Sequence, residues 1–284
     1  MKLITWNTQW CRGLDGLVSP GRIVEHARSM ADFDVLCLQE IASGYAGLPG
    51  TPGDQPAEIA ALLPGFQVFF GAAVDEFDAR GRRQRFGNLI ATRLPVAVVE
   101  HHRLPWPADP SVKSMPRLCT VVTVTDPRLG IVRVMTTHLE YYSKGQRMAQ
   151  AIALRDLQAQ ACERTAMPPV PGDVGFPFQA KPHTSRAVLC GDFNLVRDDA
   201  EFPALVESFD AGSESGRWHD AWPLANGQVA PDPTFCIYDK INGPDPIACD
   251  FWLVSDSLAR HVKRMSVDTI TQVSDHQPVL LELE

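Results

Sequence analysis

The hydrophobic pattern of the chain alternates between short continuous apolar runs and longer segments with helical spacing. The runs Val35–Leu38 and Ala187–Cys190 contain no charged residue and are typical of strands buried on both faces. Helical spacing is clearest in Gly145–Arg164, which lacks proline, and in Val18–Met30, where Pro20 stands near the start. The pattern therefore predicts many buried strands and a few helices.

Two further runs predict an antiparallel pair of strands. They are Arg117–Val124 and Ile131–Thr137, joined by the turn-forming segment Asp126–Gly130. The remaining expected strands are Lys2–Asn7, Gln67–Phe70, Gly87–Ala91, Val96–Glu100, Ile247–Val254 and Val279–Leu283, and shorter helices are expected at Glu58–Leu63 and Pro203–Phe209.

Three segments are predicted to be connections. Residues 43–56 are rich in Gly, Pro and Ser, and residues 77–85 are strongly charged. Residues 166–185 hold five prolines with little periodicity, and a loop of this length is often a lid or a binding element. No repeat, low-complexity tract or linker divides the chain, so we expect residues 1–284 to form a single domain.

Composition narrows the function without naming it. Of 284 residues, 45% are hydrophobic and 21% charged, which are ordinary values for a globular protein. The net charge of -8 argues against a basic nucleic-acid scaffold, because affinity for the phosphate backbone comes largely from Lys and Arg. The seven cysteines include no CxxC pair, and we find neither a secretion signal nor an apolar run of the ~18 residues that span a bilayer. We therefore expect a cytoplasmic protein.

Polar clusters stand where the predicted strands end, which is where α/β scaffolds gather reactive groups. Carboxylates and an amide at such positions form a hard, oxygen-rich site that suits Mg²⁺ or Mn²⁺, and two histidines add groups that titrate near neutral pH. Any one cluster alone could be an ordinary turn or a solvated strand end. The clusters are Trp6-Asn7, Gln39-Glu40, Thr137-His138, Asp192-Phe193-Asn194, Asp250 and Asp275-His276.

Together these segments resemble the motifs of the endonuclease/exonuclease/phosphatase (DNase I-like) superfamily. The resemblance extends over nearly the whole chain and is specific for the superfamily, although not for a substrate. The matching segments are Thr5-Trp6-Asn7, Leu38-Gln39-Glu40, Gly87-Asn88-Leu89-Ile90, Thr137-His138-Leu139-Glu140, Gly191-Asp192-Phe193-Asn194, Cys249-Asp250-Phe251 and Ser274-Asp275-His276.

The resemblance implies an α/β fold, a four-layer α/β/β/α sandwich of two packed β-sheets flanked by helices. It implies a Mg²⁺ or Mn²⁺ ion held mainly by Glu40, with Asn7 beside it and Asp275 completing its surroundings. The remaining roles that it implies are activation of the attacking water by His276, orientation of His276 by Asp250, contacts of Asp192 and Asn194 with the attacking oxygen and the phosphate, a phosphoryl contact from His138, and weaker substrate contacts from Asn88 and Arg117.

Two positions differ from some members of the superfamily that the chain resembles. Gln9 stands two residues after Asn7, where some AP endonucleases have a carboxylate, and this weakens the case for a second metal. His138 occupies a place where a tyrosine would indicate the AP endonuclease branch. We expect Glu140, two residues further on, to be a solvated residue rather than a polar contact.

Three functions remain open from the sequence. The first is a metal-dependent hydrolase of phosphodiesters, in a nucleic acid or nucleotide. The second is an enzyme of the same fold that acts on a small phosphoester or a phospholipid head group, which the acidic charge favours. The third is an inactive binding module, which the presence of every key residue disfavours. The sequence leaves the substrate, the number of metals and the oligomeric state open.

Overall fold

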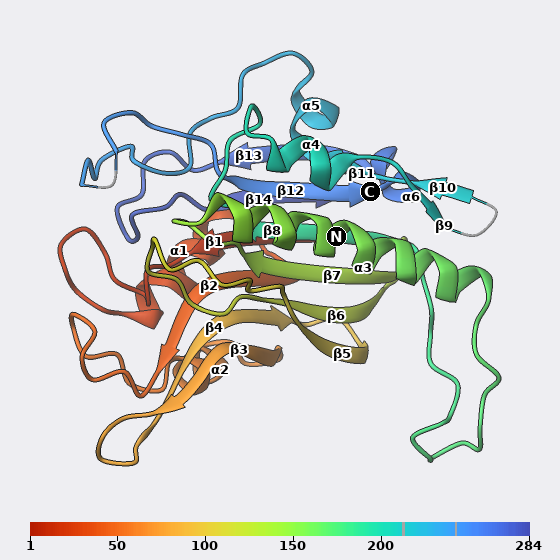
Figure 1. Cartoon of the computed structure of the whole chain (residues 1–284), viewed down its shortest axis with the longest axis horizontal. Coiled ribbons are helices and arrows are strands. Elements are labelled where there is room, and N and C mark those ends of the chain that lie inside the picture. The colour runs from red at the N-terminus through yellow and green to blue at the C-terminus, as the bar shows by residue number, and fades with distance from the viewer. Residues whose placement is uncertain (212–213, 242) are drawn as a thin grey trace.

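Two mixed six-stranded sheets form the centre of the computed structural model, which describes residues 1–211, 214–241 and 243–284 (Figure 1). The first sheet contains β1 (Lys2–Asn7), β2 (Val35–Ser43), β3 (Gln67–Phe77), β4 (Arg83–Thr92), β13 (Val262–Val267) and β14 (Val279–Leu283). The second contains β5 (Val96–Arg103), β6 (Leu118–Asp126), β7 (Gly130–His138), β8 (Ala187–Asp192), β11 (Trp218–Asp220) and β12 (Asp250–Ser255). A separate short hairpin pairs β9 (Phe209–Ala211) with β10 (Glu214–Gly216).

The strand order is β13-β14-β1-β2-β4-β3 in the first sheet and β11-β12-β8-β7-β6-β5 in the second. The sheets face each other in parallel order, so that β14 meets β12, β1 meets β8, β2 meets β7 and β4 meets β6. The helices are α1 (Pro20–Met30), α2 (Gln55–Leu62), α3 (Lys144–Ala166), α4 (Glu201–Val206), α5 (Ala221–Asn226) and α6 (Asp256–Ala259).

The continuous apolar runs follow from this layering, because successive side chains of a strand point to opposite faces. On β1, Leu3 packs between the two sheets and Ile4 packs against α1 and α2 on the outer face. On β8, Cys190 packs between the sheets and Leu189 packs beneath α3 and α4. Both faces of each central strand are covered, and the expected four-layer sandwich is confirmed.

The longer predicted helices are confirmed, and their ends have local causes. The hydroxyl of Ser19 accepts a hydrogen bond from the backbone N–H of Arg22 at 3.3 Å, and Pro20 follows at the first helical position of α1. Ser143 caps α3 in the same way through the backbone N–H of Gln146. The expected antiparallel pair of strands is also confirmed as β6 and β7.

Two predicted boundaries are wrong because tertiary contacts outweigh the local pattern. The expected connection 77–85 is limited to residues 78–82: β3 extends to Phe77, β4 begins at Arg83, and the Asp75–Arg83 ion pair, at 2.6 Å, spans the exposed hairpin. The expected helix Pro203–Phe209 ends at Val206, and Phe209 begins β9. The polar edge strand β13 has too few apolar positions to be recognised from the sequence.

Parallel pairing brings the polar strand ends together. β1 pairs in parallel with β2, with Asn7 beside Gln39, and β7 pairs in parallel with β8, with His138 beside Asp192. The antiparallel strand β12 adds Asp250 directly opposite Asp192. Both sheets therefore present their chemistry at the same edge. Among the helices in the described residues, none is long and apolar enough to cross a membrane.

Candidate active site

The strand ends enclose a pocket of about 420 Å³ at this common edge. Most of the residues singled out from the sequence meet there. Those that line it are Glu40, Arg117, His138, Asp192, Asn194, Asp275 and His276, while Asn7 and Asp250 lie directly behind them.

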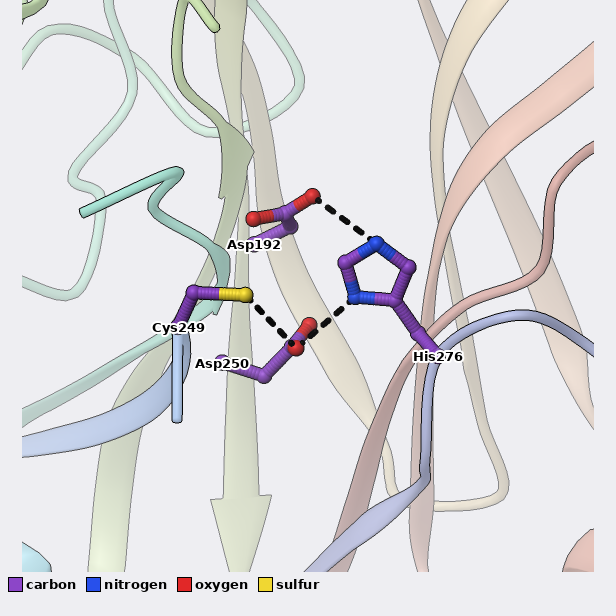
Figure 2. A group of neighbouring side chains, drawn as sticks. All are labelled: Asp192, Cys249, Asp250 and His276. Carbon is purple, nitrogen blue, oxygen red and sulfur yellow. Dashed lines mark hydrogen bonds and ion pairs between the residues drawn. The ribbon is translucent and has the colours of Figure 1, made fainter. Parts of the chain in front are cut away.

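One side of the pocket is formed by a group of four neighbouring side chains around His276 (Figure 2). The Nδ1 atom of His276 lies 2.9 Å from Oδ2 of Asp250, and its Nε2 atom lies 3.6 Å from Oδ2 of Asp192. The thiol of Cys249 donates to Oδ2 of Asp250 at 3.6 Å. The ring of Phe235 stacks on the imidazole with 4.2 Å between ring centroids. These contacts leave the imidazole one orientation, with Nε2 toward Asp192.

The ionisation of His276 depends strongly on that of the neighbouring carboxylates, Asp250 and Asp192. Burial opposes the imidazolium form, but the carboxylates of Asp250 and Asp192 outweigh it and hold the pKa of His276 well above its ordinary value. Burial also opposes ionisation of Asp192, yet the charge of His276 and the hydrogen bond from Asn7 lower its pKa. Burial in turn raises the pKa of Asp250, so the proton of this group is shared between the imidazole and its carboxylates rather than fixed on one atom.

A second set of contacts links the two sheets through Asn7. Its Nδ2 atom donates to Oδ2 of Asp192 at 2.9 Å and to Oε1 of Glu40 at 3.3 Å. His138 lies between the same two carboxylates, with Nε2 3.4 Å from Asp192 and Nδ1 3.9 Å from Glu40. Burial and the guanidinium of Arg117 lower the pKa of His138 to about 3, so these contacts join carboxylates to a neutral imidazole. A neutral ring can still donate a hydrogen bond to a phosphoryl oxygen.

Glu40 reaches the pocket through an irregularity of β2. The register between β2 and β4 shifts between Leu38 and Ile41, and Glu40 adopts a positive φ of 60°. A bulge re-aims a side chain out of the regular alternation, and bulges are over-represented beside active sites. Asn194 also has a positive φ, 52°, which turns the chain sharply after Asp192. Strained backbone thus positions two of the predicted residues.

Glu40 and Asp275 have the chemistry of a site for a divalent cation. Burial raises the pKa of Glu40 to about 7, and the negative charge of Asp275 adds to this effect. Burial likewise raises the pKa of Asp275, whose Oδ2 accepts a hydrogen bond from Nε2 of Gln9 at 2.8 Å. Two oxygen ligands whose charges are destabilised by burial and mutual repulsion fit Mg²⁺ or Mn²⁺, which would relieve both effects.

The group around His276 is a weaker candidate for a metal. Asp192, Cys249, Asp250 and His276 place potential ligand atoms within 4.8 Å of one another. However, the thiol of Cys249, Oδ2 of Asp250 and Nδ1 of His276 are already hydrogen-bonded to one another, and burial raises the pKa of Cys249 well above its ordinary value. A protonated thiol is a poor metal ligand. We therefore interpret this group as a path for protons.

Arg117 supplies positive charge at the other side of the pocket. Its Nε atom donates to Oε2 of Glu140 at 3.2 Å, and its buried Nη1 atom has no hydrogen-bond partner among the described residues. Glu140 is fully buried and also accepts from the backbone N–H of Tyr142, so the expectation that it is solvated is wrong. Asn88 is buried between the sheets, where its amide donates to the carbonyl of Leu118, and it does not line the pocket.

Three residues of the site are not predicted from the sequence. Gln9 was noted only as a departure, yet it holds Asp275. Cys249 stands in the matching segment Cys249-Asp250-Phe251 but receives no role from the sequence, and Phe235 is not singled out, although the two contact Asp250 and His276. Their positions depend on contacts across 15 or more residues, although the Cys249-Asp250 adjacency was a usable signal.

The long loop 166–185 takes no part in this pocket. It follows α3 at the opposite end of the sheets (Figure 1). It lines separate hollows together with Val98, Glu100 and Arg133 on β5 and β7. None of the residues that line the candidate active site comes from it. A lid function over the site is therefore excluded for this loop in the described conformation.

Comparison with solved structures supports the architecture. An endonuclease/exonuclease/phosphatase from Beutenbergia cavernae is 24% identical with a TM-score of 0.73, and the match covers 100% of this chain and 71% of that one. A mannosyl-6-phosphatase from Bacteroides thetaiotaomicron is 19% identical with a TM-score of 0.68, covering 100% and 99%. A 3′ phosphatase from Neisseria bound to a product DNA hairpin is 20% identical with a TM-score of 0.59, also covering 100% and 99%.

These similarities show the shared fold, and they do not transfer a substrate. A search of curated proteins finds no matching sequence. The model of the endonuclease/exonuclease/phosphatase family matches residues 4–276, which include all of the strand-end motifs from Asn7 to His276. The chain therefore belongs to the endonuclease/exonuclease/phosphatase family.

Proposed function

We propose that the protein is a divalent-metal-dependent phosphodiesterase in which His276 and Asp250 activate water for attack on phosphorus. The observation that carries this proposal is the position of the His276 imidazole between two carboxylates, 2.9 Å from Oδ2 of Asp250 and 3.6 Å from Oδ2 of Asp192. Glu40 and Asp275 form a separate pair of carboxylates in the same site. The first group can move a proton and the second can hold a cation. Hydrolysis of an anionic phosphoester needs both.

Each residue then has a role that its position supports. A water held by Nε2 of His276 and the carboxylate of Asp192 loses its proton to this coupled group, and Asp250 keeps the imidazole oriented. Neutral His138 donates to a phosphoryl oxygen, and Arg117 places positive charge near it. Asn194, whose Nδ2 donates to the carbonyl of Leu139, fixes the turn that carries Asp192.

The metal would be held by Glu40 and Asp275, with Asn7 beside it. When bound, a divalent cation neutralises phosphoryl oxygens and stabilises the leaving oxygen. The link from Asn7 to both Glu40 and Asp192 keeps the two halves of the site at a constant separation.

The alternative is a phosphatase of a small phosphomonoester. It is supported by the limited size of the pocket, about 420 Å³, and by the two basic side chains that line it, Lys113 and Arg117. Two of the similar structures are named as phosphatases, a mannosyl-6-phosphatase and a 3′ phosphatase bound to a product DNA hairpin. The net charge of -8 also suits a small substrate better than duplex DNA.

A substrate panel tests the proposal. The protein is assayed with Mg²⁺ or Mn²⁺ on bis-p-nitrophenyl phosphate, p-nitrophenyl phosphate, plasmid DNA and single-stranded DNA. We expect release of p-nitrophenol from the diester, and we expect His276→Ala to abolish most of it. Cleavage of the monoester alone would replace the proposal by the phosphatase alternative, and inactivity on the whole panel would contradict both.

A further inference from the structure

An apolar groove of about 400 Å³ adjoins the catalytic pocket. Trp10, Phe86 and Met115 line both spaces, so the groove is a continuation of the pocket rather than a separate hollow. Beyond these shared residues, its walls include Tyr45 and Trp106, and the indole of Trp106 is 50% exposed. The ring of Trp106 is therefore accessible to a ligand that extends from the catalytic pocket into the groove.

The polar groups of the groove are already engaged. The indole N–H of Trp106 donates to Ser114 at 2.9 Å, and that of Trp10 donates to the carbonyl of Pro49 at 3.1 Å. The hydroxyl of Tyr45 donates to Glu76 at 2.9 Å. Glu76 is the one charged side chain among the described residues that line the groove. A second phosphate would meet a carboxylate there, so the chemistry favours an uncharged aromatic ligand.

The position of the groove follows from the order of the strands (Figure 1). His276 precedes β14 and Asp250 begins β12, on one side of the two sheets. Glu40 on β2 and His138 on β7 lie in the middle. The groove is formed on the other side, by β3, β4 and the segment between β5 and β6 that carries Trp106. Phosphorus held at the middle would thus have the activating group and the groove on opposite sides.

This arrangement indicates which part of the substrate would enter the groove. In an in-line displacement the attacking and leaving oxygens lie on opposite sides of phosphorus. If water attacks from the His276 side, the leaving group departs toward Trp106. We propose that the groove binds a flat, uncharged aromatic leaving group, which makes the substrate an aryl or nucleoside phosphodiester. The assignment of the leaving group to the groove rests on the proposed hydrolysis. Binding of an aromatic group in the groove does not depend on it.

Two pairs of methyl phosphodiesters test this specificity. The first pair carries phenol or hexafluoroisopropanol as leaving group, which have similar acidity, so that only the aromatic ring distinguishes them. The second pair carries the 5′-oxygen of thymidine or of the same sugar without a base. Because stacking contributes about 1–3 kcal/mol per ring, we expect kcat/KM to favour the aromatic member of at least one pair by roughly tenfold. A preference in the first pair alone indicates an aryl group, and one in the second indicates a nucleobase.

The variant Trp106→Ala should remove most of this preference, and Trp106→Phe should restore it. Phe178→Ala is the matched control, because Phe178 is an exposed ring (81%) in the loop at the far end of the sheets. Equal rates within both pairs in the wild-type protein, or a preference that Trp106→Ala leaves intact, would overturn the proposal.

A binding measurement separates the groove from the hydrolysis. Titration calorimetry on His276→Ala compares phenyl phosphate and thymidine monophosphate with methyl phosphate. If the wild-type protein hydrolyses no ester but an aromatic phosphate binds at least several-fold more tightly in a Trp106-dependent manner, the proposed hydrolysis fails and the groove stands. If binding shows no aromatic preference, the groove proposal fails whatever the hydrolytic activity.

Discussion

Nδ1 of His276 lies 2.9 Å from Oδ2 of Asp250, and this buried pair joins the segment before β14 to the start of β12. The pairing crosses from one sheet to the other. It brings together two motifs that stand 26 residues apart. The consequences for turnover can be measured directly.

Asp250→Asn should lower kcat about 10²–10⁴-fold with little change in KM, because the amide no longer stabilises the imidazolium of His276. The double variant Asp250→Asn/His276→Ala should be no slower than His276→Ala alone, since the two residues work as one group. Steady-state kinetics on bis-p-nitrophenyl phosphate gives both values. Asp268→Asn is the matched control, because it changes a similar carboxylate–histidine pair with His26, at 2.7 Å, outside the pocket. Additive effects of the two changes would contradict a coupled pair.

The affinity for Mn²⁺ should rise with pH, because the carboxyl of Glu40 must lose its proton to bind a cation. Burial raises the pKa of Glu40 to about 7, so protons compete below pH 7 and cease to compete above it. We expect titration calorimetry to show about tenfold tighter binding at pH 8 than at pH 6. Glu40→Gln should weaken binding and abolish this dependence, whereas Glu207→Gln, at an exposed ion pair with Arg155, should do neither. A pH-independent affinity in the wild-type protein would refute the assignment of Glu40.

Cys249→Ser should leave the affinity for Mn²⁺ within about twofold, because a cation held by Glu40 and Asp275 does not contact the thiol. The serine hydroxyl can still donate to Asp250, so kcat should fall less than in Cys249→Ala. Titration calorimetry and kinetics on both variants check this. A large loss of Mn²⁺ affinity in Cys249→Ser would instead place the cation among Asp192, Asp250 and His276.

Gly191→Ala should destabilise the protein by more than about 4 kcal/mol. Gly191 has a φ of +137°, and a Cβ atom there would overlap the carbonyl oxygen of Thr137 on the neighbouring strand. Gly65→Ala is the control, because Gly65 has a φ of +85° with open space around it and should cost only about 1–3 kcal/mol. Urea unfolding of both variants measures the difference. Equal losses would show that backbone strain alone accounts for the effect at Gly191.

The fold and most of the site could be predicted because their signals are local. Strands such as β1 and β8 are covered on both faces, and this produces continuous apolar runs that end at Asn7 and Asp192. Parallel pairing then brings those ends to one edge, as with His138 beside Asp192. A cytoplasmic location and a single domain remain predictions.

The rest could not be predicted because it depends on contacts between distant segments. The bulge that aims Glu40 into the pocket depends on pairing with β4, and no residue type in β2 marks it. Gln9 reaches Asp275 across 266 residues of sequence. Trp106 and Met115 lie in an irregular segment without periodicity, so only the structure shows that they form a groove with Phe86.

The central claim is that a divalent cation at Glu40 is required for phosphodiester hydrolysis. The most direct test is the rate of p-nitrophenol release from bis-p-nitrophenyl phosphate by protein treated with EDTA, before and after Mg²⁺ or Mn²⁺ is added back, in the wild type and in Glu40→Gln. We expect chelation to abolish the activity of the wild-type protein, the added metal to restore it, and Glu40→Gln to show no recovery. Full activity in EDTA, or near wild-type turnover in Glu40→Gln, would contradict it.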